Sequence, residues 1–326
     1  MKKILVTGAD GFIGSHLVEI LLKKKYDVRA LVFYNSQNNW GWLEENNSNK
    51  KLKVISGDVR DPHQCKEITQ GIDCVINLAA LIAIPYSYKA PSSYISTNVM
   101  GTLNLCKASI ENNVKRFIQI STSEVYGTAK YVPIDEKHPL KAQSPYSASK
   151  ISSDAIAYSF YSSFNLNLSI ARPFNTFGPR QSARAIIPTI ITQALSNKKK
   201  IYLGDLSPTR DFTYVEDTCE GIIEIMNSKK TIGKTVNIGS NTEINIKSLV
   251  KLIKSYTKKD FKVIEQIKRK RPKKSEVFRL RCDNTLLKRL TNYKSKLDFK
   301  QGLKKTIDWF QIKENLKKYK SDIYNI

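Results

Sequence analysis

The stretch KILVTGADGFIG, residues 3–14, decides the fold. Residues 3–7 form a short apolar run typical of a strand, glycines follow at Gly8, Gly11 and Gly14, and an amphipathic helix pattern continues to about Lys24. Glycine lets a backbone turn tightly against a pyrophosphate, and the N-terminus of the following helix offers free amides and a positive dipole end. Glycine turns are common, but one that lies between a strand and a helix in this order predicts a dinucleotide-binding unit.

Apolar runs farther along the chain predict six more strands of the same sheet, at residues 27–33, 52–56, 74–78, 116–120, 168–173 and 235–238. Helix patterns lie between them, as in α/β proteins. We therefore expect a Rossmann-type doubly wound parallel sheet with a smaller C-terminal substrate-binding lobe. The expected domains are residues 1–176 for the dinucleotide, with 211–242 returning to that domain, and residues 177–210 with 243–326 for the lobe.

The segment STSEVYG, residues 121–127, directly follows the expected strand 116–120. Thr122, Ser123 and Glu124 should therefore lie at the C-terminal end of that strand, where open α/β sheets bind their ligands. Before strand 116–120, a long helix is expected from about residue 91 to residue 112, and its Asn98 could fix the catalytic strand, 116–120, through backbone contacts.

The segment SPYSASK, residues 144–150, predicts the start of a helix. Ser144 is a natural N-cap and Pro145 a natural first helical residue, so Tyr146 and Lys150 should share one helix face. A phenol has a pKa of about 10, but a neighbouring ammonium and a positive nicotinamide both favour the phenolate, which could take a proton from a substrate hydroxyl. Any helix can carry this spacing by chance, so the prediction depends on its context.

The composition excludes several classes of protein. No apolar run approaches the roughly 20 residues of a membrane span, so we expect a cytoplasmic protein that does not enter a membrane. Five cysteines are scattered without a CxxC pair, and the three histidines form no ligand spacing. Neither disulfides nor a metal site are expected.

The net charge of +25 raises the possibility of nucleic-acid binding. The lysines are spread along the chain, however, with short runs where helices end or loops begin, and no nucleic-acid recognition motif is present. Most of this charge is explained by lysines on solvent-exposed faces. The functional role left for the charge is to attract a nucleotide diphosphate.

The end of the second expected strand bears on the choice of cofactor. It reads Val32-Phe33-Tyr34-Asn35, with neither an acid to hold a ribose diol nor an arginine to hold a 2′-phosphate. NAD is favoured because no basic residue is present, and NADP stays open. After the third strand, Asp58 could accept a hydrogen bond from the adenine amino group. Small residues at Ala79 and Ala80 would let a cofactor lie close.

Together, the glycine turn, Asn98, Thr122, Tyr146 and Lys150 resemble the extended branch of the short-chain dehydrogenase/reductase superfamily, and the resemblance covers essentially the whole chain. It implies a nicotinamide dinucleotide held by Gly8, Gly11, Phe12, Ile13, Gly14, Asp58, Val59, Leu78, Ala79, Ala80, Asn98, Tyr146 and Lys150.

Within that branch, STSEVYG is similar to the nucleotide-sugar 4,6-dehydratases, because epimerases of the branch lack the glutamate. Residues 81–88, 181–184 and 34–36 are similar to the N-acetylglucosamine 4,6-dehydratases of legionaminic acid biosynthesis. GDP-mannose dehydratases share the Thr-Ser-Glu order, whereas deoxythymidine-diphospho-glucose dehydratases have aspartate in place of Ser123. Both GDP-linked and UDP-linked substrates stay open.

The resemblance also implies a nucleotide-diphosphate sugar bound by Ile84, Tyr86, Asn175, Arg184, Arg210, Arg271 and Glu276. Guanidinium groups match phosphate oxygens well, which suits the three arginines. Arg180 is expected to be an ordinary surface residue. The apolar segment 81–88 is expected to be a loop, either a wall that faces the sugar or ordinary packing. Such relatives usually form dimers, so a homodimer is expected.

The implied reaction has three stages. Tyr146 removes the O4 proton while a hydride leaves C4, with Thr122 bound to O4 and Lys150 holding the ribose and the phenolate. The 4-ketone acidifies the C5 proton, which Glu124 removes as the C6 hydroxyl leaves, and Ser123 orients O6. The hydride then returns to C6. The alternatives are a nucleotide-sugar 4-epimerase, which needs no base at C5, and a non-catalytic dinucleotide-binding module.

Overall fold

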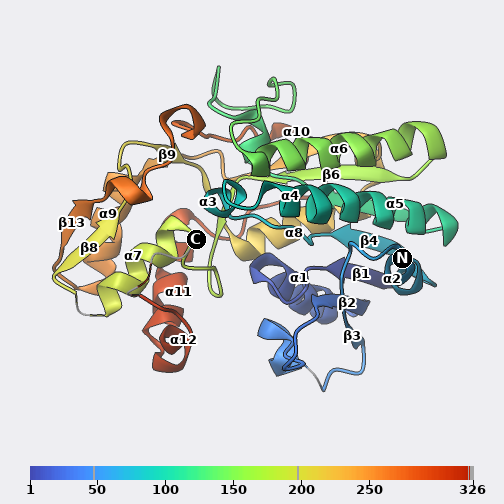
Figure 1. The fold of residues 1–326 in the computed structure, drawn as a ribbon, viewed down its shortest axis with the longest axis horizontal. Coiled ribbons are helices and arrows are strands. Elements are labelled where there is room, and N and C mark those ends of the chain that lie inside the picture. The colour runs from blue at the N-terminus through green and yellow to red at the C-terminus, as the bar shows by residue number, and fades with distance from the viewer. Residues whose placement is uncertain (47, 197, 322, 324–326) are drawn as a thin grey trace.

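A parallel sheet of seven strands forms the centre of the protein, which we describe from a computed structural model covering residues 1–46, 48–196, 198–321 and 323. The strand order is β11-β6-β5-β4-β1-β2-β3 (Figure 1). The strands are β1 (Lys3–Thr7), β2 (Asp27–Phe33), β3 (Leu52–Gly57), β4 (Cys74–Asn77), β5 (Arg116–Ile120), β6 (Leu168–Pro173) and β11 (Lys234–Ile238). This is the predicted doubly wound Rossmann-type sheet. The direction of winding reverses between β1 and β4, the position where such sheets bind ligands.

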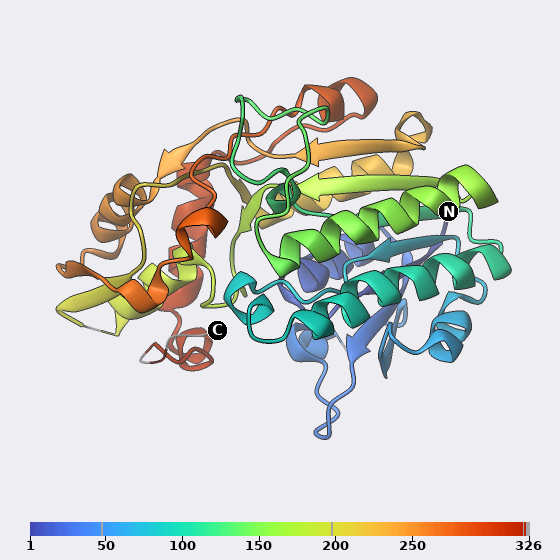
Figure 2. The same ribbon diagram turned by 45° about the horizontal axis from the view of Figure 1, so that its top comes forward.

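Helices cover both faces of the sheet, because alternate residues of each strand point to opposite sides. Along β1, Ile4 and Val6 belong to one apolar core and Leu5 to the other. The first face carries α1 (Phe12–Lys23) and α8 (Val215–Asn227), and the second carries α2 (Pro62–Thr69), α5 (Gly101–Glu111) and α6 (Pro145–Phe164). Figure 2 shows α5 and α6 running side by side.

Local chemistry starts several helices where the sequence predicts. The Asp61 carboxylate accepts hydrogen bonds from the amides of His63 and Gln64, and Pro62 opens α2. The Ser144 hydroxyl accepts from the amide of Ser147 and opens α6. Each side chain satisfies a backbone donor that has no partner within its helix.

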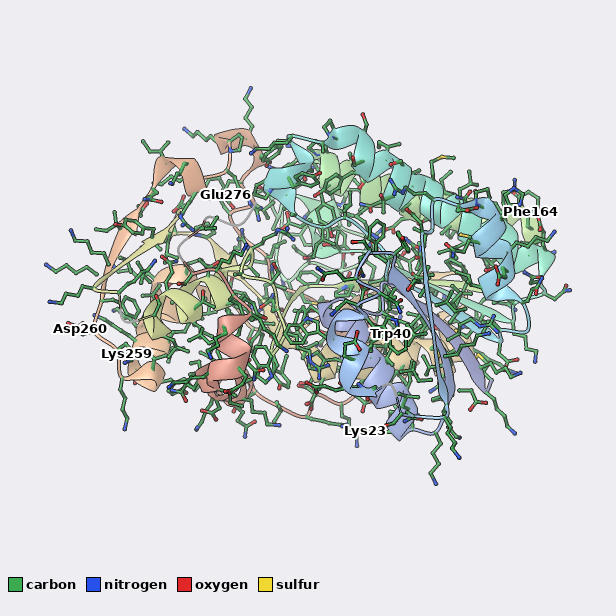
Figure 3. The ribbon with its side chains drawn as sticks, turned by 60° about the horizontal axis from the view of Figure 1, so that its bottom comes forward. Lys23, Trp40, Phe164, Lys259, Asp260 and Glu276 are labelled. Carbon is green, nitrogen blue, oxygen red and sulfur yellow. The ribbon has the colours of Figure 1, made fainter. Side chains whose placement is uncertain are left out.

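The smaller lobe is built from short strand pairs and helices (Figure 1). Its pairs are β7 (Asn175–Phe177) with β10 (Phe212–Tyr214), β9 (Thr209–Arg210) with β12 (Ile244–Asn245), and β8 (Lys200–Leu203) with β13 (Lys262–Glu265). Its helices include α7 (Ile186–Leu195), α9 (Ile246–Thr257), α11 (Phe299–Gln311) and α12 (Lys313–Lys317). Figure 3 labels Glu276 in this lobe and Phe164 at the distant end of α6. The return of β11 to the sheet agrees with the predicted order of the chain.

The structure corrects three predicted elements. The expected helix 91–112 is divided into α4 (Pro91–Tyr94), a π-helical turn η2 (Ile95–Met100) and α5, and Asn98 lies in that turn. The expected loop 81–88 contains the short helix α3 (Ile84–Ser87). Strand β4 ends one residue early, because the next two amides, of Leu78 and Ala79, donate to the hydroxyl of Thr7 instead of to a strand.

None of the helices within the described residues is long and apolar enough to span a bilayer.

Candidate active site

The glycine turn after β1 is closed too tightly for side chains. Gly8 has φ +62°, and a Cβ on Gly14 would lie 2.2 Å from the Gly8 carbonyl oxygen. A Cβ on Gly8 would lie 3.0 Å from the backbone of Ala79, so the segments after β1 and β4 almost touch. Gly11 caps α1 without a side-chain hydrogen bond, which leaves the N-terminus of the helix to a ligand. These features fit a dinucleotide pyrophosphate.

The adenosine side of this turn differs in detail from the prediction. Asp58 follows β3 as expected, but its Oδ2 already accepts a hydrogen bond from Arg60 Nε at 2.8 Å. Phe33 and Tyr34, at the end of β2, are 60% and 67% exposed. The turn brings Asp10 to this end of β2, where its carboxylate accepts a hydrogen bond from the Phe33 backbone amide. Burial nevertheless raises the pKa of Asp10. The sequence therefore misses an acid that comes from another part of the chain.

Helix α6 carries the predicted pair on one buried face. Tyr146 is 7% and Lys150 is 4% exposed. The Lys150 ammonium donates to the Ile120 carbonyl at 2.6 Å, and the Tyr146 hydroxyl is hydrogen-bonded to the Thr122 side chain. The helix thus brings the phenol and the ammonium to the C-terminal end of β5, as the spacing predicts.

The electrostatics of this pair differ from the expectation. Burial raises the pKa of Tyr146 well above that of a free phenol, and the Glu124 carboxylate raises it further, against the Thr122 hydrogen bond. Burial also lowers the pKa of Lys150 to about 8, against the attraction of Asp154. In the chain by itself Tyr146 is therefore a phenol, because desolvation outweighs the neighbouring ammonium.

Glu124 lies in a cluster of two carboxylates and two guanidinium groups. Its Oε2 is 3.6 Å from Arg271 Nη1, while Arg210 Nη2 is 3.1 Å from Glu276 Oε1. Burial lowers the pKa of Arg210. The Glu124 carboxylate opposes this decrease, and the neighbouring Arg271 increases it, so the Glu124–Arg271 and Arg210–Glu276 pairs influence each other. The structure thus joins the turn after β5 to three predicted substrate residues of the lobe, among them the Glu276 of Figure 3.

The other predicted substrate residues surround Tyr146 or the start of β7. Ile84 packs with Tyr146 and Tyr94, and Tyr86 contacts Tyr94 at 6.2 Å between ring centroids. Arg184 is close enough to Tyr94 to lower its pKa, although burial raises that pKa overall, to about 12. At the start of β7, Asn175 has a buried Oδ1 without a hydrogen-bond partner among the described residues, as expected of an amide that meets a ligand.

Two predicted roles are wrong. Asn98 does not fix the catalytic strand β5: its amide group pairs with the backbone of Leu81 and with the Ser149 hydroxyl, so it joins the loop after β4 to α6. Arg180 is not an ordinary surface residue. Its side chain is 12% exposed, pairs with Glu19 at 2.7 Å and lies over the Trp42 ring.

The sequence also misses three residues that support the site. Tyr94 is fully buried, lies edge-on to Tyr146 and donates from its hydroxyl to the Ala83 carbonyl. Asp154 and Arg172 form an ion pair at 3.0 Å beside Lys150. The position of Asp154, four residues after Lys150, is the only one of the three that a helix-face argument could have found.

Residues 5–306 match the model of the GDP-mannose 4,6-dehydratase family. The chain belongs to this family. A low-salt glycan biosynthesis protein of Haloferax volcanii is 32% identical to it over 313 residues, which cover 94% of this chain and 98% of the relative.

Two solved structures show the range of chemistry among its relatives. The dTDP-glucose 4,6-dehydratase of Streptomyces venezuelae, with NAD bound, has a TM-score of 0.87 and 28% identity, and covers 96% of this chain and 98% of its own. The UDP-glucuronic acid 4-epimerase of Bacillus cereus, in complex with UDP-glucuronic acid and NAD, has a TM-score of 0.87 and 29% identity. The match covers 95% of this chain and 99% of the epimerase. The chain is thus similar to both nucleotide-sugar dehydratases and 4-epimerases.

Proposed function

We propose that this protein is an NAD-dependent nucleotide-sugar 4,6-dehydratase. The position of Glu124 carries the proposal. Its carboxylate lies at the end of β5, close enough to Tyr146 to raise the pKa of that phenol, and it is 12% exposed. A 4-epimerase needs the tyrosine but no second base. A carboxylate beside the phenol is what removal of a C5 proton requires.

The glycine turn would hold the NAD pyrophosphate, and Lys150 would hold its ribose. Bound NAD accepts the hydride from C4 and later returns it to C6, so the cofactor ends each turnover as it began. Its positive nicotinamide also opposes the burial that keeps Tyr146 protonated. This is consistent with a phenol that is inactive as a base until cofactor binds.

The chain's own residues perform the proton transfers in this proposal. Tyr146 takes the proton from O4, and Thr122 hydrogen-bonds the same oxygen. Glu124 takes the C5 proton once C4 is a ketone, and it is then a neutral acid that can give that proton to the departing C6 oxygen. Water leaves. When the hydride returns to C6, C5 takes up a proton, which balances the O4 proton that Tyr146 gives up to complete the cycle.

For the substrate we propose GDP- or UDP-linked N-acetylglucosamine, within legionaminic acid biosynthesis. The support is the similarity of residues 81–88, 181–184 and 34–36 to enzymes of that pathway. Arg184, Arg210 and Arg271 would bind the diphosphate, together with the amide of Asn175. Glu276 would contact the nucleotide ribose.

We also propose a homodimer in which α5 and α6 meet a second copy. Four large apolar side chains are 45–55% exposed on or just before these two helices, namely Ile95, Met100, Tyr158 and Phe164. Two subunits could remove these groups from water together. The molar mass in solution, from light scattering, tests this arrangement.

The function is tested by incubating the protein with GDP- and UDP-linked N-acetylglucosamine and measuring the mass of the product. We expect a product lighter by one water. A product of unchanged mass but altered C4 configuration would instead establish the 4-epimerase, which the similarity to the Bacillus cereus enzyme makes the second candidate. No turnover of any nucleotide-sugar would favour a non-catalytic dinucleotide-binding module.

A further inference from the structure

Helix α6 holds the end of β5 by more than its two expected residues. Tyr146, Lys150 and Asp154 follow one another at intervals of four, so they lie on one helix face, and all three are buried. Their side chains form hydrogen bonds with three consecutive residues at the end of β5 in the same chain, 120–122. In this set, the Asp154 Oδ2 accepts a hydrogen bond from the Ser121 hydroxyl at 2.6 Å.

The same carboxylate oxygen also holds the far end of the catalytic turn, through Arg172 of β6. Arg172 Nη2 donates to Asp154 Oδ2 at 3.0 Å, and Arg172 Nη1 donates to the Tyr126 hydroxyl at 3.1 Å. Tyr126 is the last residue of the short helix η3 (Ser123–Tyr126). Thr122, Ser123 and Glu124 therefore lie between two points that are both fixed by Asp154.

We propose that Asp154 is a positioning residue for the reaction: it holds the catalytic segment at Ser121 and, through Arg172, at Tyr126, and it places a negative charge one helical turn from Lys150. The proposal rests on the proposed function for the role of that segment. Asp154 itself is expected to touch neither substrate nor cofactor.

The surroundings of Lys150 support the electrostatic part. Burial lowers the pKa of Lys150 to about 8, and the Asp154 carboxylate is the group that opposes the change. The other charged or titratable groups of this region are Tyr146 on the same helix, with Glu124 and Tyr94 beside it, and Arg172 of β6 with its partner Tyr126. Of these groups, only Asp154 combines a negative charge with a place on the next turn of the same helix face.

One feature separates this role from a purely structural ion pair. The second carboxylate oxygen, Oδ1, is buried without a hydrogen-bond partner among the described residues. A buried acceptor without a partner is costly, so such atoms in native proteins require an explanation. The charge on this carboxylate acts on Lys150, one turn earlier on the same helix face.

The test measures release of NAD from the loaded protein, without any sugar, as a function of pH. In the wild type, release should accelerate above about pH 8, where Lys150 loses its proton and its hold on the ribose. In Asp154→Asn the acceleration should begin about one pH unit lower, because the opposing charge is gone. Ser121→Ala is the matched control, since it removes a hydrogen bond to the same oxygen but leaves the charge. It should keep the wild-type pH profile of NAD release and slow turnover by about ten- to a hundredfold, as for one lost hydrogen bond.

Asp154→Asn leaves the buried Arg172 unpaired and could fail to fold. The double variant Asp154→Asn with Arg172→Gln removes both charges and should show a smaller downward shift, because loss of the Arg172 cation partly offsets loss of the carboxylate. Superimposable release profiles for the wild type and either folded variant would overturn the proposal. A wild type that releases NAD as described but dehydrates no sugar would refute the proposed function alone.

Discussion

Replacing Glu124 with glutamine should separate the two halves of the reaction. The variant keeps the shape of the side chain but cannot take the C5 proton or return it to the C6 oxygen. General acid–base catalysis contributes about 10²–10⁴-fold, and because one carboxylate serves both transfers we expect a loss near 10⁴-fold, or about 5 kcal/mol of activation free energy.

Oxidation at C4 should survive in this variant. The Glu124 carboxylate raises the pKa of Tyr146, so its neutralisation makes the phenol a slightly stronger acid and eases formation of the phenolate. Arg271 loses a partner at 3.6 Å, but it is 25% exposed and can be solvated. Reduced cofactor should therefore accumulate without dehydrated product, which absorbance and product mass measure together.

The matched control is Ser123→Ala at the neighbouring position. Ser123 is 2% exposed, and a single hydrogen bond from it to O6 is worth about ten- to a hundredfold in rate. Dehydration should slow by that amount and no more. If Ser123→Ala is as inactive as Glu124→Gln, the mechanism with a single carboxylate is wrong, and Ser123 belongs to a proton relay.

Three further results are expected. Tyr146→Phe keeps the ring that packs on Ile84 and Tyr94 but cannot accept the O4 proton. The variant should bind cofactor and sugar, and rapid mixing should show no transient absorbance of reduced nicotinamide. A normal transient would remove Tyr146 from the first step. The purified protein should carry NAD that was never added, and denaturation that releases only NADP would contradict the preference for NAD. Gly14→Ala places a Cβ 2.2 Å from a backbone oxygen and should abolish NAD retention. Gly71→Ala is the control: Gly71 has open space around it and φ +66°, so the variant should lose about 1–2 kcal/mol of stability but retain NAD.

Sequence reasoning succeeded where structure depends on local chemistry. The glycine turn, the N-cap at Ser144 and the four-residue spacing of Tyr146 and Lys150 each have a backbone or helix-face cause that a short segment contains. The order of the strands also follows from these local units, because right-handed crossovers between parallel strands leave few topologies.

The sequence could not show what depends on contacts between distant segments. The π-helical turn at Asn98 lies where that side chain meets the Leu81 backbone and Ser149, and neither contact has a signature within residues 91–112. The raised pKa of Tyr146 is a consequence of its burial, which spacing along a helix does not reveal. The Asp154–Arg172 pair likewise joins a helix to a strand.

The pairing of Glu124 with Arg271, and of Glu276 with Arg210, has a consequence for the order of events. Without a substrate, the two carboxylates act as counter-ions for the arginines that we expect to bind the diphosphate. An arriving diphosphate would compete for both guanidinium groups. As Arg271 turns to the phosphate, its contact with the Glu124 carboxylate at 3.6 Å is broken, and the carboxylate is released toward the sugar. The enzyme would thus keep its C5 base paired with Arg271 until the nucleotide end of a substrate displaces it, so that a sugar without its diphosphate would meet a carboxylate still held by the arginine.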